Sequence, residues 1–252
     1  MYGKKLASYY DSIYSGKDYK KEVDFLKTLL PDDFKFQKVL DVGCGTGEHL
    51  RSFLDLGEKI ELVGVDRSPY MIEEAKGKKE LENITFISAD ASQVPCQGFD
   101  LITSMFNVVN HIETLDELNK FFKTIREKIK KNHFFIFDSW NGIAATRSLP
   151  MYNKRVIKNT PIGTIKVEHH PKIDLMNSTV KMINNVDVLN DKGYIIDNIE
   201  YELTHVLWTP KVLKDLLKMN GFEIKGIYGG GYEKKAKAQY EDYKIIFLCK
   251  AV

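Results

Sequence analysis

Long apolar runs are absent from this sequence, and so is an apolar leader segment. No uninterrupted apolar stretch approaches the roughly 18 residues that a membrane-spanning helix requires. The start of the chain, Met1–Lys5, is not followed by the apolar region that a secretory signal needs. The pattern therefore indicates a cytoplasmic protein that has no membrane partner.

Cysteine is scarce, and neither sign of charge dominates. The 3 cysteines, Cys44, Cys96 and Cys249, are far apart and form no C-x-x-C pair, so neither a disulfide framework nor a metal site is predicted. Lys and Arg total 37 against 35 Asp and Glu, and the lysines are scattered. This distribution offers no basic surface for a nucleic acid. A chain of this length buries roughly 70–75% of its unfolded surface without such covalent or metal support.

The most informative stretch is Lys38–Leu50, where an apolar run ends in a turn of small residues and a helical pattern begins. Glycines in this turn leave the backbone open to a ligand and permit positive φ angles. A dinucleotide fingerprint would need glycine where Glu48 stands, and no Gly-Lys-Ser/Thr follows as in a P-loop. The pattern D-x-G-x-G-x-G from Asp41 to Gly47 resembles the glycine turn of the class I S-adenosylmethionine-dependent methyltransferases.

A regular alternation of strands and helices surrounds this turn. Further strands are indicated over 60–66, 84–91, 99–107 and 134–138, and a helix over 116–131. Such an alternation predicts a doubly wound parallel sheet, whose ligands bind at the carboxyl ends of the strands. Together with the final strands 222–228 and 243–249, the resemblance implies an α/β fold with a seven-stranded Rossmann-like methyltransferase sheet.

The pattern of apolar residues changes after the fifth strand. Alternating and β-branched runs separated by turn signals predict an antiparallel β-sheet inserted there, before a helix that begins at Thr209-Pro210. We therefore expect one methyltransferase domain over residues 1–252, in four parts: an N-terminal helical lid (1–34), a cofactor-binding core (36–140), the inserted sheet (150–208) and a return to the core (209–252).

Asp66 ends the second strand about 20 residues after the turn, where an acid can accept hydrogen bonds from both hydroxyls of a ribose. Met71, in the helix that follows Ser68-Pro69, is placed to pack on an adenine face. The resemblance adds that Asp90 holds the adenine amino group and Ala91 a ring nitrogen. It implies S-adenosyl-L-methionine as cofactor, with contacts at Tyr14, Tyr19, Asp41, Gly43, Cys44, Gly45, Gly47, Asp66, Arg67, Met71, Asp90, Ala91, Met105 and Asn107.

A closer resemblance extends over nearly the whole chain. The motifs Tyr10-Asp11-x-x-Tyr14-x-x-Lys17-Asp18-Tyr19, Gly45-Thr46-Gly47-x-His49-Leu50 and Ser104-Met105-Phe106 look like those of the N-methyltransferases that act on nucleotide-linked amino deoxysugars. The resemblance implies a dTDP-linked amino sugar as acceptor and a homodimer formed through the inserted sheet. The segment Asp138-Ser139-Trp140-Asn141 departs from the Glu-Pro-Trp-Trp that is usual in that family.

His111 and Tyr14 are the candidate catalytic residues. His111 follows the fourth strand and titrates near neutrality, so it is either a general base or a capping or packed side chain. His49 either contacts the polar end of the cofactor or faces solvent. A pyrophosphate acceptor would need cations, which Arg155 could supply. The substrate candidates are Tyr10, Trp140, Arg155 and His169.

Three alternatives stay open at this stage. The N-terminal tyrosines and His111 also suit a glycine- or sarcosine-type N-methyltransferase, or an O-methyltransferase for small molecules. A binding protein that keeps the cofactor fold without turnover is the third.

Overall fold

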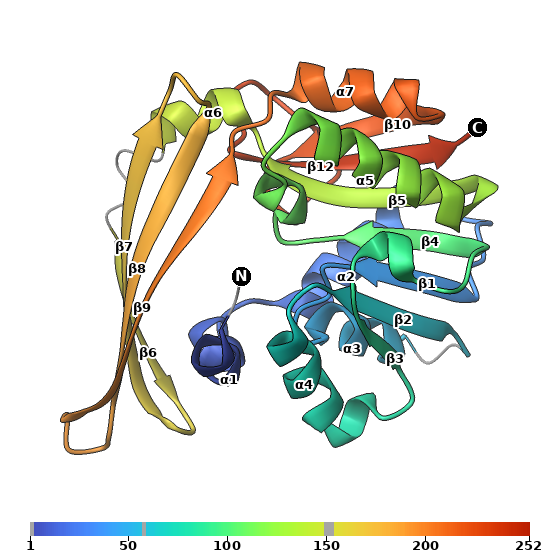
Figure 1. Ribbon diagram of the computed structural model, residues 1–252. Coiled ribbons are helices and arrows are strands. Elements are labelled where there is room, and N and C mark those ends of the chain that lie inside the picture. The colour runs from blue at the N-terminus through green and yellow to red at the C-terminus, as the bar shows by residue number, and fades with distance from the viewer. Residues whose placement is uncertain (1–2, 57–58, 149–153) are drawn as a thin grey trace.

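The computed structural model describes residues 3–56, 59–148 and 154–252, which form a large α/β core and a smaller sheet that stands beside it (Figure 1). The core sheet has the strand order β11-β10-β12-β5-β4-β1-β2-β3. Its strands are β1 (Lys38–Val42), β2 (Glu61–Asp66), β3 (Thr85–Ser88), β4 (Phe99–Ser104), β5 (Ile129–Trp140), β10 (Phe222–Gly229), β11 (Ala236–Lys237) and β12 (Lys244–Ala251).

The first five strands of the core sheet run parallel, and β12 pairs antiparallel with β5 and with β10. This is the predicted doubly wound sheet, to which the two-residue strand β11 adds an eighth member beside the seven expected. Because β1, β2 and β4 are neighbours with the same direction, their carboxyl ends meet at one edge. That edge carries Asp66 and the glycine turn.

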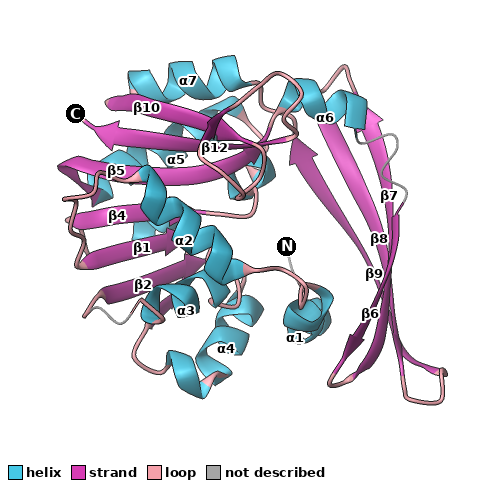
Figure 2. Ribbon diagram, turned by 180° about the vertical axis from the view of Figure 1, so that it is seen from behind, coloured by secondary structure: helices cyan, strands magenta, loops and turns pink. Residues whose placement is uncertain are grey.

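Helices cover both faces of the core sheet (Figures 1 and 2). One face buries its apolar side chains against α2, α3 and α4, and the other against α5 and α7. None of the helices in the described ranges is long and apolar enough to cross a membrane. The core helices are α2 (Tyr19–Leu29), α3 (Glu48–Leu54), α4 (Pro69–Gly77), α5 (Leu115–Lys128) and α7 (Pro210–Met219), with short helices η1 (Lys79–Leu81), η2 (Ala91–Gln93), η3 (Val108–His111) and α6 (Gly142–Ser148).

The boundary between α5 and β5 corrects the sequence prediction. The helix was expected to continue to Lys131, but it ends at Lys128 and the strand begins at Ile129. Ile129 pairs with Phe99 in the sheet, and the ammonium of Lys130 lies 2.6 Å from a carboxylate oxygen of Asp100. Tertiary pairing of the backbone and of this buried carboxylate therefore overrides the helical pattern.

The inserted sheet is antiparallel, with the order β6-β7-β8-β9. It forms because apolar residues alternate along β7 and β8 and pack against one side of α1 (Lys4–Ile13), whose Leu6 and Ile13 belong to the same cluster as Ile165 and Val167. The opposite side of α1 packs on α4 of the core, so that α1 lies between the two sheets (Figure 1). The strands are β6 (Lys154–Thr160), β7 (Gly163–Asp174), β8 (Thr179–Leu189) and β9 (Ile195–Val206).

One buried amide joins the inserted sheet to the core. The Asn110 side chain in η3 donates to the carbonyl of Val206 at 2.8 Å and accepts from the backbone N–H of Trp140 at 2.9 Å. The indole N–H of Trp208 donates to the carbonyl of Val109 at 3.2 Å. The end of β9 is thereby fixed against η3, immediately beside His111.

Candidate active site

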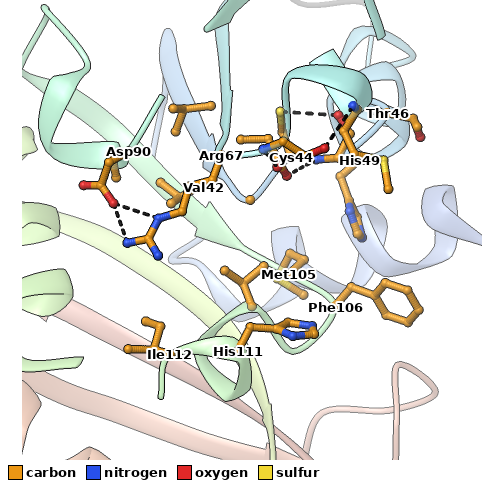
Figure 3. Close-up of a pocket in the computed structure, with 18 of the residues that line it drawn as sticks. Val42, Cys44, Thr46, His49, Arg67, Asp90, Met105, Phe106, His111 and Ile112 are labelled. Carbon is orange, nitrogen blue, oxygen red and sulfur yellow. Dashed lines mark hydrogen bonds and ion pairs between the residues drawn. The ribbon is translucent and has the colours of Figure 1, made fainter. Parts of the chain in front are cut away.

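A cavity of about 500 Å³ opens at the carboxyl ends of β1, β2 and β4. Its volume suits a small molecule, since ligand pockets commonly measure about 300–1,000 Å³. The core lines most of it, α1 contributes Tyr10, and β9 of the inserted sheet contributes Glu202, Leu203 and Thr204. Figure 3 shows the glycine turn on one side and Met105, Phe106 and His111 along another.

The three glycines of the turn are required for different reasons. All three have positive φ angles, of 74° at Gly43, 54° at Gly45 and 85° at Gly47. An added Cβ would lie 2.5 Å from a methyl carbon of Val108 at Gly43, and 2.9 Å from Leu81 and Phe86 at Gly47. At Gly45, which lines the cavity, it would meet nothing within 4 Å. The backbone of Gly45 therefore faces open space, so a ligand can approach it closely.

Two carboxylates lie near the turn, and one of them, Asp66, bonds to it directly. Asp66 accepts hydrogen bonds from the backbone N–H groups of Gly45, at 2.9 Å, and Ser68, at 2.8 Å. Asp66 lines the cavity, and its burial raises the pKa of its carboxyl group. Asp41 is fully buried, does not line the cavity, and accepts from the Thr103 hydroxyl at 2.7 Å. Burial raises the pKa of Asp41 to about 6.

The predicted adenine end is formed by Met71, Arg67, Asp90 and Ala91, all of which line the cavity. Arg67 donates to Asp90 through Nε at 2.9 Å. Partial burial opposes ionisation of Asp90, but hydrogen bonds from Ser92 and from the Arg67 guanidinium outweigh it and lower the pKa of this carboxyl group. Met71 is 1% exposed and packs with Tyr10 of α1.

The end of β4 carries unusual backbone and an unsatisfied acceptor. Phe106 and Asn107 follow each other with φ angles of 69° and 64°, which strains non-glycine residues by about 1–3 kcal/mol each. The N–H of Asn107 donates to Asp138 at 2.6 Å, and this bond holds the turn. The buried Oδ1 of Asn107 has no hydrogen-bond partner within the described residues. Asn107, a predicted cofactor contact, does not itself line the cavity, whereas its neighbours Phe106 and Val108 do.

A lysine that the sequence analysis did not single out places a buried ammonium group beside this strand end. The ammonium of Lys17 pairs with Glu22 and lies 4.4 Å from the ring centroid of Tyr19 and 4.9 Å from that of Phe106. Glu22 also lies 2.8 Å from Nε2 of His49. His49 is therefore buried, not exposed to solvent, and it also lines the cavity, as contact with a cofactor would require. The place of Lys17 within the Tyr14-x-x-Lys17-Asp18-Tyr19 motif was the signal that could have identified it.

The two candidate catalytic residues occupy different positions. His111 ends η3 and lines the cavity, and its ring forms a hydrogen bond with the backbone of Thr204. Burial lowers the pKa of His111 to about 4. Tyr14 caps α1 and packs edge-on against Phe106, with ring centroids 5.0 Å apart, behind the residues that line the cavity.

The remaining substrate candidates are divided between the cavity and its surroundings. Tyr10 lines the cavity, whereas the other three do not. Trp140 stacks behind His205, Arg155 is exposed and pairs with Glu168, and Nδ1 of His169 lies 2.7 Å from the Asn184 amide. The sequence analysis did not identify Glu202, Leu203 and Thr204, because the alternation of apolar and polar residues along β9 does not indicate which of them reach the core.

Residues 39–132 match the family model described as Methyltransferase domain. The chain is 28% identical over 234 residues to an uncharacterised protein of Methanocaldococcus jannaschii, covering 90% of this chain and 77% of the relative. It is 30% identical to the mitochondrial ubiquinone biosynthesis O-methyltransferase of Schizosaccharomyces pombe, over 60% of this chain and 56% of that one. A dTDP-3-amino-3,4,6-trideoxy-alpha-D-glucopyranose N,N-dimethyltransferase of Streptomyces venezuelae is 29% identical, over 56% of this chain and 59% of the relative. The chain thus spans little more than half the length of the two named enzymes.

Solved structures share the whole fold. An S-adenosylmethionine-dependent methyltransferase from Clostridium acetobutylicum superposes with a TM-score of 0.80 at 24% identity, over 98% of both chains. CalS10, an amino pentose methyltransferase from Micromonospora echinaspora solved with S-adenosylmethionine bound, gives a TM-score of 0.73 at 18% identity, over 96% of both chains. At these identities the likeness shows that both the core and the inserted sheet belong to one known architecture.

The position of Asp66 gives a quantitative prediction. Asp66→Ala should weaken S-adenosylmethionine binding by about 1–3 kcal/mol, because the variant loses the carboxylate expected to hold the ribose and frees the Gly45 N–H. Isothermal titration calorimetry measures the change, and Asp187→Ala on the inserted sheet is the control. An unchanged dissociation constant for Asp66→Ala would contradict the ribose assignment.

Three independent observations now agree. The glycine turn opens onto a cavity at the carboxyl ends of parallel strands, residues 39–132 match the methyltransferase domain, and the fold matches S-adenosylmethionine-dependent enzymes over its full length. Residues 39–132 therefore match a methyltransferase domain, within a fold that S-adenosylmethionine-dependent methyltransferases share.

Proposed function

We propose that this methyltransferase N-methylates the amino group of a nucleotide-linked (dTDP) amino deoxysugar. The observation that carries the choice of an amino group is His111, whose imidazole lines the cavity after β4 and whose pKa burial lowers. Support for the sugar comes from the relative that dimethylates a dTDP-linked amino sugar and from the fold shared with CalS10. The cavity continues from the glycine turn to β9, which leaves room for an acceptor beside the cofactor.

The cofactor supplies a methyl group on a positively charged sulfur, which an amine displaces in line. The chain then has to align the amine, exclude water and tolerate the positive charge. Tyr10 and Phe106 line the cavity, and Tyr14 packs against both rings. Aromatic faces attract a desolvated cation, so this cluster suits the sulfonium.

The lowered pKa of His111 argues against the role of general base. Taking a proton from an ammonium with a pKa of about 8 onto a group with a pKa of about 4 would cost about 5 kcal/mol. Because that cost is large, we infer that the amine binds uncharged and that the ring of His111 orients it. The amine lone pair then points at the methyl carbon.

The acceptor is tested with labelled S-adenosylmethionine and a panel of compounds. We expect label on dTDP-3-amino or dTDP-4-amino deoxysugars, read by mass, which also counts the methyl groups added. The matching hydroxyl sugars, glycine and a small phenol are the controls. Label on any of these controls instead would replace the amino-sugar assignment, and cofactor binding without any methylation would favour a binding protein.

The role of His111 predicts a particular pH dependence. A group whose pKa is lowered to about 4 is uncharged above that pH, so wild-type kcat should show no inflection from a histidine between pH 5 and 8. His111→Ala should lower kcat about 10- to 100-fold throughout this range, since it removes an orienting contact. His170→Ala, an exposed histidine on β7, is the control. A loss confined to low pH would instead identify His111 as a general base.

We also propose that the inserted sheet pairs two copies of the chain. Its end exposes Ile157, Tyr194, Ile195 and Ile196, each more than half accessible. Light scattering should give a dimer for the wild type and a monomer for the double variant Ile195→Lys, Ile196→Lys. Met219→Lys, which changes an exposed apolar residue of α7, should stay dimeric. A monomeric wild type would contradict this proposal.

A further inference from the structure

The free edge of the inserted sheet borders the cavity. β9 is the last strand in the order β6-β7-β8-β9, so it pairs with β8 on one side only. Three consecutive residues of β9 line the cavity, namely Glu202, Leu203 and Thr204. Successive side chains of a strand point to opposite faces of its sheet, so three in a row cannot all point into one space. The strand therefore meets the cavity edge-on and presents its backbone to it.

Hydrogen bonds show which way the backbone groups of β9 point. Three even-numbered residues of β9 turn their backbone toward the core, where a side chain of α1 or η3 bonds to each of them. The partners are Lys5 for Asn198, His111 for Thr204 and Asn110 for Val206. The N–H of the odd-numbered Leu207 points the other way and donates to the carbonyl of Ser178, beside β8, at 2.7 Å.

Glu202 belongs to the even-numbered series. The pairing of β9 with β8 is regular from Asn198 to Val206, and backbone groups along such a strand alternate in direction with a period of two residues. The N–H and C=O of Glu202 therefore also point toward the core, where this residue lines the cavity. Neither group bonds to another residue in the described part of the chain.

The side chain of Glu202 is engaged along the inserted sheet. Its carboxylate lies 3.0 Å from the ammonium of Lys181 on β8, and both side chains are about half exposed. What Glu202 offers to the cavity is therefore its backbone, in which an N–H donor and a C=O acceptor lie next to each other and point the same way. An unpaired strand edge of this kind is a ready-made hydrogen-bonding surface.

This edge lies apart from the predicted cofactor contacts. Asp66 and Asp90 follow β2 and β3, at one end of the core sheet. β9 is joined instead to η3, which follows β4, through the bond from Asn110 to Val206. A ligand group that reaches β9 across the cavity therefore belongs to the methyl acceptor, not to the cofactor.

We propose that the free backbone edge of β9 at Glu202 binds a hydroxyl group of the methyl acceptor. The N–H of Glu202 donates to the hydroxyl oxygen, and the C=O of Glu202 accepts a hydrogen bond from the same group, since a hydroxyl both donates and accepts. This inference rests on the proposed function, because it names a further group of the same acceptor. Ring hydroxyls of an amino deoxysugar meet this requirement, whereas glycine has no such group.

The N–H of Glu202 can be observed directly by NMR. The ¹⁵N-labelled protein is saturated with S-adenosylhomocysteine, which donates no methyl group, and the amide resonances are assigned by backbone experiments. Adding the dTDP-3-amino deoxysugar should shift the Glu202 amide resonance, whereas adding glycine should not. The amide of Glu200, which lies on the same edge but does not line the cavity, should stay in place with both.

The outcomes of the titration separate this inference from the proposed function. A Glu202 resonance that stays in place with every hydroxyl-bearing compound of the panel would overturn the inference, even if the amino sugar is methylated. A shift with a hydroxyl sugar or phenol that also receives the methyl label would support the inference and contradict the amino-sugar assignment.

A matched pair of variants tests the same N–H by kinetics. Glu202→Pro removes the N–H, and proline is tolerated where a strand N–H points away from its sheet. Glu202→Ala removes the carboxylate alone. Because one hydrogen bond is lost, KM for the acceptor should be about 3- to 10-fold higher in Glu202→Pro than in Glu202→Ala. The dissociation constant of S-adenosylmethionine should be the same in both variants.

Glu200→Pro is the control for proline in this edge. It changes the backbone two residues away, outside the cavity lining, and should leave both constants at the wild-type value. Equal KM values in Glu202→Pro and Glu202→Ala would overturn the inference. So would a parallel loss of S-adenosylmethionine binding in Glu202→Pro, which would indicate a distorted site. If Glu202→Pro does not fold, the NMR titration of the wild type decides.

Discussion

The buried side chain of Asn110 is the contact on which the arrangement of this enzyme depends. It lies in a four-residue helix after β4 and bonds at once to the backbone of β5 and of β9. The Asn110 side chain is 0% exposed, so its amide group must find its hydrogen-bond partners inside the protein. These bonds fix the register in which η3, β5 and β9 meet. That register places His111 at the cavity and brings Glu202, Leu203 and Thr204 of the inserted sheet to its opposite wall.

The edge of the sheet that carries the cavity also carries strain and desolvated polar groups. Asn107 has a strained backbone and an unpaired buried oxygen, which each cost about 1–3 kcal/mol. Asp66, which lines the cavity, is a carboxylate whose burial raises its pKa and which two backbone N–H groups hold in place. The carboxylate is therefore fixed in position before any ligand binds.

Much of this could be predicted from the sequence, for a physical reason. Parallel strands that are buried on both faces read as continuous apolar runs, and their carboxyl ends are marked by Gly43 to Gly47, Asp66 and Asp90. Residues whose role depends on a distant partner could not be found in this way. The ammonium of Lys17 is buried because Glu22, Tyr19 and Phe106 lie around it. His205 is buried against the rings of Trp140 and His111, which are far away in the sequence. The predicted end of α5 was wrong because Ile129 pairs with a strand, and the local periodicity of the sequence does not show this pairing.

The connection between η3 and β9 also bears on how the enzyme assembles. The hydrogen bonds from Asn110 to Val206 and from Trp208 to Val109 join residues 96 and 99 positions apart in the chain. The cofactor turn, by contrast, is closed by Asp66 and Gly45, which are 21 positions apart. Contacts of large sequence separation carry a greater loop-closure entropy and form slowly. On a ribosome, the glycine turn can close once β2 has emerged, whereas the contacts of η3 have to wait for β9 and Trp208.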